Sequence, residues 1–402
     1  MDQQAWIKKG LDAGRVFTPT SPIDEKSLFA GRIEQIRAII DVINQKGQHA
    51  IVYGERGVGK TSLVSVLSGY LEAPSVMAPR VNCDSTDSFE TVWKKAFEQI
   101  ELSRFQAGVG FTANAQFDKF RSSELLGESI TPDSVRRALT VLSSNALTIF
   151  IIDEFDRLSQ EPRHAFADTI KALSDHAVPA TVIIVGVSDS VSGLIAEHQS
   201  VERALVQVQM PRMSNEEVKQ IIRTGVKKLR MKVLTPALRQ IANLSQGLPH
   251  YAHLLGLYSV RSATDSRVLD IGPDIVRKAI EKSIKGANQS IRTSYDLAVR
   301  SARKDNLFSN VLLSCALANT SDLGYFAAQG VRDPMKKITG KSYEITSYAQ
   351  HLNEFCDEKR GPILQKTGTQ RMYRYRFINP LMQPFVIMQG IQSGQIASSI
   401  LD

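Results

Sequence analysis

The alternation of apolar and polar positions in the first half of the chain predicts strands and helices in turn. Short apolar runs, typical of strands buried on both faces, occur at 49–53, 76–85, 147–153, 180–188 and 204–210. Helical spacing of apolar residues follows Lys60 and recurs at 88–100 and 163–177. Because strands that alternate with helices form parallel sheets, we predict an α/β core with helices on both faces.

The pattern changes twice along the chain. Weak alternation and two glycines at 106–117 predict a small hairpin, within an insertion at 102–130 to which the sequence assigns no role. From Ser214 to 288 the periodicity is purely helical, which predicts a separate helical lid. The tail then reads as three helices followed by two strands at 362–367 and 371–380, the order of a winged helix. We therefore predict a core at 1–211, a lid at 212–304 and a winged-helix domain at 305–402.

A glycine-rich segment joins the first predicted strand to the first predicted helix. It reads GERGVGKT from Gly54 to Thr61 and fits the pattern GxxxxGK[ST] at every required position. In that pattern backbone N–H groups and the helix N-terminus surround phosphate, Lys60 reaches the β- and γ-phosphates, and Thr61 offers its hydroxyl to Mg²⁺. The residues predicted to bind ATP here are Gly54, Gly57, Val58, Gly59, Lys60, Thr61 and Ser62. The alternative is a chance glycine-rich turn.

Acidic residues end the predicted strand at 147–153. Asp153 can hold Mg²⁺ through water, and Glu154 is placed to polarise the attacking water as general base. Both would lie at the carboxyl edge of the sheet, beside the phosphate loop. The string DEFD also hints at a helicase, but no other helicase motif is visible. The next strand ends at Ser188 and Asp189, where a residue that senses the γ-phosphate belongs; simple capping of the strand end is the alternative.

The net charge of +8 is unevenly placed. Residues 212–304 contain 18 basic and 7 acidic side chains, a net charge of +11, whereas residues 1–211 have a net charge of −5. Such a basic segment suits an acidic partner, nucleic acid included, or is a solvated helical surface. Three scattered cysteines, no secretory signal and no long apolar run predict a cytoplasmic protein with reduced thiols and no membrane partner.

With these motifs the chain resembles the AAA+ ATPases, and within them the replication-initiator and STAND-like signalling group with a C-terminal winged helix. The segment LFAGR at 28–32 looks like the part that packs near adenine, which implies a nucleotide contact for Arg32. The stretch around Arg203 looks like the region of an arginine finger, a catalytic residue that would act on a neighbouring subunit and would require a homo-oligomer. The segment SQGLPHYAHLLG resembles the lid element, which implies contacts to the nucleotide from Pro249 and His250.

Two departures from the family pattern point to slow turnover. Many members have an arginine in the lid element where this chain has His250, and the usual sensor asparagine is replaced by Ser188 or Asp189. The leading hypothesis is an ATP-binding, magnesium-dependent ATPase switch that acts on or near DNA in replication, transposition or defence. The alternative is a STAND-like ATPase that regulates a separate effector protein without binding DNA. A small-molecule kinase is a distant third, because no acceptor site is evident.

Overall fold

The computed structural model groups the chain into two compact units. It describes residues 2–21, 31–106, 116–144, 146–195, 201, 203–302, 306–369 and 372–397. The sheet unit comprises Arg32–Gly54 and Lys60–Met210, and the helical unit comprises Met1–Gly31, Glu55–Gly59 and Pro211–Asp402. The predicted three-domain division stays a prediction. It assigned the first 31 residues to the core, whereas they group with the helical unit.

The sheet unit is built on a six-stranded sheet in the order β2-β6-β7-β1-β8, with β3 also paired to β6. Its strands are β1 (His49–Gly54), β2 (Val76–Met77), β3 (Arg80–Asn82), β6 (Leu147–Asp153), β7 (Ala180–Val187) and β8 (Leu205–Gln209). All their pairings are parallel. The register places Gly54 opposite Val187 and Asn82 opposite Asp153, so the polar strand ends meet at one edge of the sheet. The predicted α/β fold class is confirmed.

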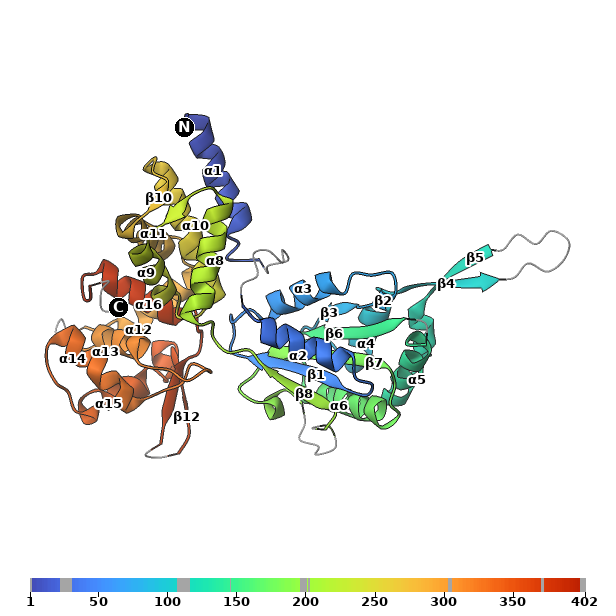
Figure 1. Ribbon diagram of the computed structural model, residues 1–402. Coiled ribbons are helices and arrows are strands. Elements are labelled where there is room, and N and C mark those ends of the chain that lie inside the picture. The colour runs from blue at the N-terminus through green and yellow to red at the C-terminus, as the bar shows by residue number, and fades with distance from the viewer. Residues whose placement is uncertain are drawn as a thin grey trace. The chain divides into compact units, whose positions relative to one another are not determined.

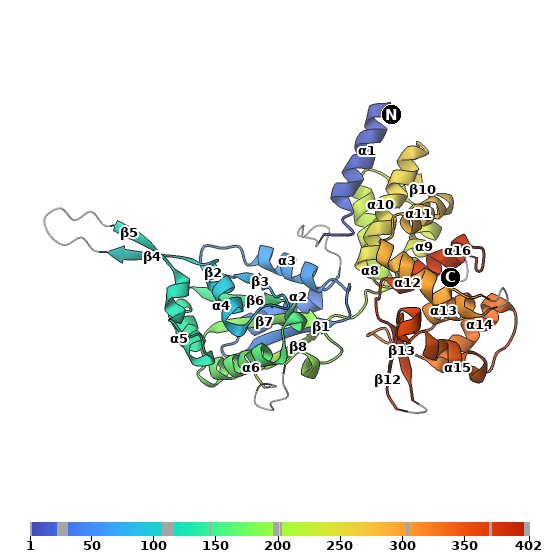
Figure 2. The same ribbon diagram turned by 180° about the vertical axis from the view of Figure 1, so that it is seen from behind.

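Helices cover both faces of this sheet (Figures 1 and 2). They are α2 (Ile33–Ile43), α3 (Lys60–Tyr70), α4 (Phe89–Phe97), α5 (Pro132–Leu142) and α6 (Gln160–Asp175). The segment predicted as one strand at 76–85 forms two short strands, β2 and β3, separated at Pro79. Proline has no N–H to donate to a ladder, although the Pro79 carbonyl still accepts from Ile151 N–H at 3.0 Å.

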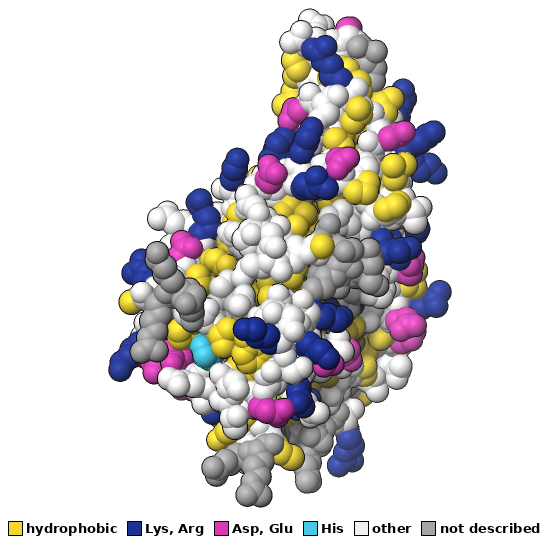
Figure 3. Space-filling view, turned by 90° about the vertical axis from the view of Figure 1, so that its left-hand side faces the viewer, with side chains coloured by type: hydrophobic (Ala, Val, Ile, Leu, Met, Phe, Trp, Pro, Cys, Tyr) yellow, Lys and Arg dark blue, Asp and Glu magenta, His cyan; other side chains and the backbone are white. Residues whose placement is uncertain are grey.

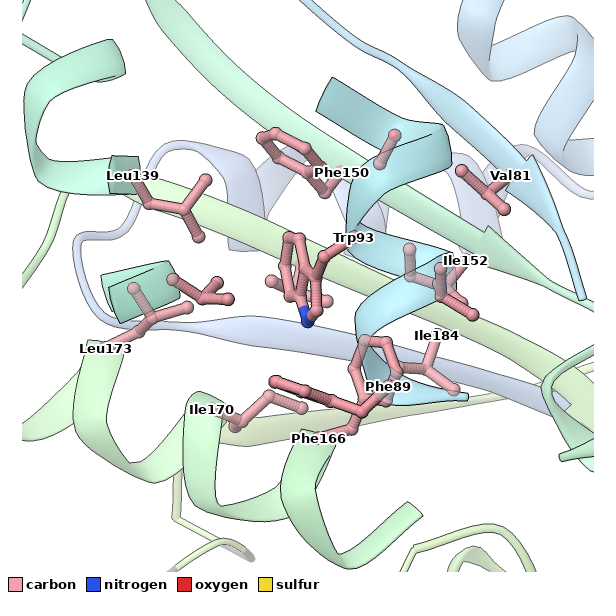
Figure 4. Packing of buried hydrophobic residues seen from close by; sticks show 14 of the residues in the cluster. Val81, Phe89, Trp93, Leu139, Phe150, Ile152, Phe166, Ile170, Leu173 and Ile184 are labelled. Carbon is pink, nitrogen blue, oxygen red and sulfur yellow. The ribbon is translucent and has the colours of Figure 1, made fainter. Parts of the chain in front are cut away.

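An aromatic cluster fills the space between the sheet and helices α4 and α6 (Figure 4). Trp93 is fully buried, stacks on Phe166 at a centroid distance of 5.5 Å, and contacts Phe150 at 5.3 Å. The cluster takes alternate residues of β6, Phe150 and Ile152, because successive side chains of a strand point to opposite faces. The strands whose polar ends meet at the sheet edge therefore pack against a buried apolar layer.

The predicted hairpin is present as β4 (Glu101–Gln106) and β5 (Gln116–Arg121), which pair in antiparallel register. The part of the prediction at 107–115 lies outside the described residues.

The helical unit begins with α1 (Gln3–Val16) and continues after Pro211 with the predicted lid. The lid helices are α8 (Asn215–Lys228), α9 (Thr235–Ser245), α10 (Pro249–Asp265) and α11 (Pro273–Lys285), with β9 (Lys232–Val233) paired to β10 (Asp270–Ile271). Helix α10 contacts α1, α8, α9 and α11. Helix α10 has buried side chains on most of its sides, as expected of a helix at the centre of a helical bundle.

The tail forms the predicted helices and wing. Its elements are α13 (Phe308–Leu317), β11 (Phe326–Ala327), α14 (Arg332–Thr339), α15 (Ile345–Glu354), β12 (Leu364–Thr367), β13 (Arg374–Phe377) and α16 (Met382–Gln392). Helix α12 (Gln289–Val299) precedes them, within the range predicted for the lid. The wing strands pair in antiparallel register with β11 added, in the order β11-β13-β12. Helix α16, which the sequence analysis did not predict, packs against α13, α11, α12 and α9.

The three cysteines are free: Cys83 and Cys315 are buried and Cys356 is half-buried. Within the described ranges, the helices are too short or too polar to traverse a lipid bilayer.

Candidate functional site: a phosphate loop and the strand ends beside it

The phosphate loop runs from the end of β1 to the start of α3. Gly54 ends β1 with a φ of 153°, and a Cβ there would lie 2.4 Å from the Met210 carbonyl oxygen, so only glycine fits. Lys60 begins α3 and is 7% exposed, and its Nζ donates a hydrogen bond to the Gly54 carbonyl at 3.0 Å. The lysine at the end of the loop is thus tied to the glycine at its start.

The other loop residues take the conformations that the motif requires. Gly57 and Gly59 have φ values of 86° and 97°, in the region that favours glycine. Val58 is buried, whereas Thr61 and Ser62 are half-buried in the first turn of α3. The first N–H groups of any α-helix lack a carbonyl acceptor one turn earlier in the same helix, which is the property that makes a helix N-terminus attract anions.

Asp153 and Glu154 lie at the carboxyl end of β6, as predicted, but in different surroundings. Asp153 is 2% exposed, and its Oδ1 accepts the Glu154 N–H at 2.8 Å. Glu154 has a φ of 55°, a left-handed conformation that is uncommon outside glycine and found often at functional sites. Its side chain is 44% exposed and pairs with Arg157 at 3.1 Å.

Arg80 is a member of this group that the sequence analysis did not find. Its Nη2 donates to Asp153 Oδ2 at 2.7 Å, and its Nη1 donates to Ser65 Oγ of α3 at 2.8 Å. The side-chain amide of Gln99 brackets the Arg80 backbone, accepting its N–H at 3.1 Å and donating to its carbonyl at 2.8 Å. Gln99 thereby takes the place of a neighbouring strand at the outer edge of β3. The only sequence signal was a basic residue inside an apolar stretch.

Asp156 is a second residue that was missed, and it organises the end of β7. Its Oδ1 accepts the Val187 N–H at 2.7 Å, which links the turn after β6 to the strand end where the sensor residue is predicted. Ser188 and Asp189 follow directly and are both half-buried. Ser188 Oγ donates to the Ser190 carbonyl at 2.7 Å, the capping interaction that was the alternative interpretation. Asp156 is the third acid of the string DEFD, which was its sequence signal.

The lid element that was predicted to contact nucleotide begins at the N-terminus of α10. Pro249 is its first residue, and its Cγ would lie 3.6 Å from a Cβ placed on Gly59. His250 Nδ1 is 2.7 Å from the Pro19 carbonyl oxygen, and burial lowers the pKa of His250. His253 Nδ1 accepts the Thr18 N–H at 3.2 Å. Both histidines therefore hold the chain segment at 18–19, a role that the sequence analysis did not anticipate.

A buried polar network, the Glu55–Arg212 network, lies in the helical unit and comprises Glu55, Arg212, Gln246 and Gln383. Arg212 Nε and Nη2 donate to the two oxygens of Glu55 at 2.7 and 3.0 Å. Arg212 Nη1 donates to Gln383 Oε1 at 2.6 Å. Gln383 Nε2 donates to Gln246 Oε1 at 3.1 Å and to the Ala316 carbonyl at 2.9 Å. The network therefore joins the second residue of the phosphate loop to the lid, to α13 and to α16.

Comparison with protein-family models gives the class of the domain. Residues 28–185 match the model described as AAA ATPase domain. The matched segment spans the phosphate loop, Asp153 and Glu154. The match covers residues 28–185, less than half of the 402-residue chain. The predicted resemblance to AAA+ ATPases and the predicted enzyme class, hydrolysis of ATP, are confirmed.

Solved structures similar to this chain include the Walker-type ATPase of Pyrococcus abyssi, with 14% identity and a TM-score of 0.51, covering 92% of this chain and 99% of that one. Cdc6p from Pyrobaculum aerophilum is 13% identical with a TM-score of 0.47, and the match covers 95% of this chain and 99% of that one. The Aeropyrum pernix ORC1 protein in complex with DNA is 15% identical with a TM-score of 0.47, and the match covers 93% of this chain and 95% of that one. At these identities the similarity concerns the fold alone. A search of curated protein sequences finds no significant match.

The AAA+ resemblance also singles out two arginines of the sheet unit, Arg32 and Arg203. Arg32 is 4% exposed and precedes α2 with a φ of 62°; the first three residues of its predicted segment, 28–30, lie outside the described residues. Arg203 is exposed just before β8, beside residues 196–200 and 202, which also lie outside the described residues. The roles of both toward nucleotide stay predictions.

The wing exposes less positive charge than the basic residues in its two strands imply. Tyr375 and Phe377 are buried, and Arg374 is exposed, as the alternation indicates. Arg376, however, is half-buried and stacks over the Tyr325 ring at 4.6 Å. Lys366 lies over the Tyr373 ring at 3.7 Å and donates to Asn353. Arg371, near the turn of the wing, lies outside the described residues.

Proposed function

We propose that this AAA protein is a slow, magnesium-dependent ATP switch, in which the phosphate loop is coupled to the winged helix. The observation that carries the proposal is the pairing of a GxxxxGK[ST] loop, closed by the Lys60–Gly54 hydrogen bond, with acids at the end of a parallel strand. In this arrangement Lys60 and the loop amides would bind the β- and γ-phosphates of ATP. The lid residues Pro249 and His250 and the adenine-side residue Arg32 complete the proposed nucleotide contacts.

The residues beside the loop fit a magnesium ion. Mg²⁺ prefers oxygen ligands, and Thr61 and Asp153 supply a hydroxyl and a carboxylate. The Asp153 carboxylate is held by the Glu154 N–H and by Arg80, which limits its rotation. When bound, the ion would neutralise charge on the β- and γ-phosphates.

Hydrolysis would proceed by attack of water on the γ-phosphorus. The new bond forms from the water oxygen, the bond from phosphorus to the bridging oxygen breaks, and ADP leaves. Glu154 would accept the proton of the water, and Ser188 or Asp189 would contact the γ-phosphate. Glu154 is half-exposed and already paired with Arg157, so it must leave that pair to act as base. This requirement is consistent with slow turnover.

The Glu55–Arg212 network supports a switch rather than a simple hydrolase. Glu55 belongs to the phosphate loop, and Gln383 belongs to α16, which packs on α13 of the winged helix. A shift of the loop on hydrolysis would change the partners of a charge that is buried and cannot be satisfied by water. We infer that the winged helix follows the nucleotide state through this network.

The action of the switch on DNA is the finer part of the proposal. Residues 212–304 have a net charge of +11, and the exposed Arg374 adds to it. Figure 3 shows basic side chains spread over the visible face with acidic ones among them, so phosphate contacts would be scattered rather than gathered in one basic patch. Binding would be weak, salt-sensitive and tolerant of sequence.

The second candidate function, regulation of a separate effector protein, is favoured by the wing itself. Arg376 and Lys366 are engaged with Tyr325 and Tyr373, and α15 exposes Gln350 and Asn353 beside the acids that follow it. A recognition helix with this surface is poorly suited to a phosphate-lined groove. In either case we propose a cytoplasmic homo-oligomer, with Arg203 acting on the ATP of a neighbouring subunit.

The test measures ATPase rate and particle mass together, with and without ATP and with and without duplex DNA. We expect slow hydrolysis whose rate per protomer rises with protein concentration. Glu154→Gln should keep ATP binding and lower the rate by ~10²-fold or more, because the carboxamide keeps the shape but cannot accept the proton. Normal hydrolysis by Glu154→Gln would place the base elsewhere.

The DNA arm of the test uses Arg374→Ala with Arg376→Ala. Loss of one phosphate contact each would lower the slope of log affinity against log salt by about 2. A smaller change, of about 1, would match the engaged state of Arg376. No DNA binding by the wild type at low salt with ATP present would favour the effector-regulating function.

A further inference from the structure

The guanidinium of Arg80, which is always positively charged, contacts Asp153, the carboxylate expected to bind Mg²⁺. The Arg80–Asp153 pair is short, at 2.7 Å, and its side chains are 23% and 3% exposed. Among the described residues, Arg80 Nε is buried without a hydrogen-bond partner, so the guanidinium is held through its two Nη groups alone. One of these groups is on Asp153 and the other on Ser65.

The position of Arg80 does not depend on its own side chain. The side-chain amide of Gln99, which follows α4, forms hydrogen bonds with the N–H and the carbonyl of Arg80. On its other edge β3 pairs with β6. The Arg80 backbone is therefore hydrogen-bonded on both sides, by the Gln99 side chain and by β6, while the guanidinium reaches Asp153 and Ser65. The side chain can change partners without loss of the strand.

We propose that Arg80 is a built-in counter-cation for Asp153, which lowers the affinity of the site for Mg²⁺ and permits ATP to bind without the metal. The inference rests on the proposed nucleotide site. Without a cation, the Asp153 charge would repel a triphosphate; Arg80 cancels that charge. The same guanidinium repels a dication and occupies one of the oxygens that the ion would use, so Mg²⁺ must displace it.

The proposal makes two predictions of opposite sign for one substitution. Arg80→Gln removes a positive charge and leaves Asp153 uncompensated. The site should then bind Mg²⁺ about tenfold more tightly and metal-free nucleotide about tenfold more weakly, as expected for one charge a few ångströms away in a partly solvated site. A residue with a merely structural role would shift both affinities in the same direction or neither.

The experiment measures binding of the β,γ-imido analogue of ATP by calorimetry, in EDTA and across a range of Mg²⁺ concentrations. The wild type should bind the analogue in EDTA within about tenfold of its affinity in saturating Mg²⁺. Arg80→Gln should lose most binding in EDTA and reach half-saturation at about one tenth of the wild-type Mg²⁺ concentration. Arg80→Lys keeps the charge and should stay close to the wild type in both measurements.

Arg157→Gln is the matched control. Arg157 also pairs with a strand-end acid, Glu154, but both side chains are about half-exposed and screened by solvent. Its Mg²⁺ midpoint should change by less than about twofold. Thermal unfolding of each variant checks that the fold is intact, and the wild-type comparison in EDTA stands without any variant.

The outcomes separate the two proposals. A wild type that binds no analogue at any Mg²⁺ concentration would overturn the proposed function itself. A wild type that binds only with Mg²⁺, or equal Mg²⁺ midpoints in the wild type and Arg80→Gln, would overturn the role of Arg80 and leave the ATP site standing.

Discussion

Both units of this protein contain an arginine–carboxylate pair at 2.7 Å, but in different settings. In the sheet unit, Arg80 meets Asp153 at 2.7 Å with a single contact to the acid, at the end of a strand and 23% exposed. In the helical unit, Arg212 meets Glu55 at 2.7 Å through two contacts and is 11% exposed. A neighbouring glutamine then takes up a further donor of Arg212, whereas Arg80 Nε has no such partner among the described residues.

The difference suggests that one ion pair serves ligand binding and the other stabilises the fold. A pair with one contact at a sheet edge can open when a ligand offers a better partner. A pair with two contacts inside a network of amides loses several hydrogen bonds at once if it opens. Substitutions at the strand ends should therefore change ligand binding and leave the fold intact, whereas substitutions in the Glu55–Arg212 network should change both.

The largest effect is expected on the sheet side of the comparison, from Lys60→Ala. It removes the charge that reaches the β- and γ-phosphates, so ATP binding should fall more than ~100-fold while the free energy of unfolding changes by less than about 1 kcal/mol. Calorimetric titration with ATP and denaturant unfolding measure the two quantities. Arg56→Ala, an exposed arginine of the same loop, is the control and should bind ATP normally. Micromolar binding by Lys60→Ala would contradict the phosphate-loop assignment.

The next effect comes from the helical unit. Arg212→Ala leaves Glu55, 3% exposed, without its charge partner and should lower the free energy of unfolding by about 3–5 kcal/mol. The double variant Glu55→Gln/Arg212→Gln removes both charges and should recover at least about 2 kcal/mol of that loss. Arg277→Ala breaks an ion pair with Asp274 that is 69% and 86% exposed, and should cost less than about 1 kcal/mol. Denaturant unfolding followed by circular dichroism compares them; equal losses in Arg212→Ala and Arg277→Ala would erase the contrast.

Acidification should lower the stability of the two units by similar amounts, so the contrast between the two ion pairs does not extend to the response to pH. Burial lowers the pKa of His49 and of His253 to about 4, and each Nδ1 accepts a backbone N–H, from Val182 and Thr18. A histidine kept neutral in the fold contributes full stability above its unfolded pKa of about 6.5, and that stability is lost as the pH falls toward 4. Each should cost about 1.4 kcal/mol between pH 7.5 and 5.5.

Trp93 fluorescence in a Trp6→Phe background reports the sheet unit in this experiment. His49→Gln should remove the pH dependence seen by Trp93, since the amide oxygen still accepts from Val182 and does not titrate. An unchanged slope in His49→Gln would mean that another group controls the acid response of the sheet.

Local patterns predicted the part of the site that is contiguous in sequence. The phosphate loop and the acids after β6 were found because a short motif and an apolar run each determine a structure within ten residues. Arg80 was not found, since its partner Asp153 is 73 positions away and nothing in the sequence marks the pair. Glu55 and Arg212 are 157 positions apart, and the same reason applies.

Helix α16 was missed for a different reason. Its residues Phe385, Val386, Ile387 and Met388 are all buried, so the apolar pattern has no helical period to detect. The wing was predicted in its strands but not in its charges, because the stacking of Arg376 on Tyr325 joins two segments 51 positions apart. Sequence patterns thus predicted most helices and strands but not the polar contacts between residues far apart in the sequence.

The most direct test of the coupling between phosphate loop and winged helix is hydrogen exchange of α16, measured with and without the β,γ-imido analogue of ATP. In the wild type, the analogue should change the exchange of peptides covering both the phosphate loop and Met382–Gln392. In Gln383→Leu, which cuts the network but leaves the loop in place, the loop should respond and α16 should not. If α16 exchanges at the same rate with and without nucleotide in the wild type, while the phosphate loop is protected, the coupling does not exist.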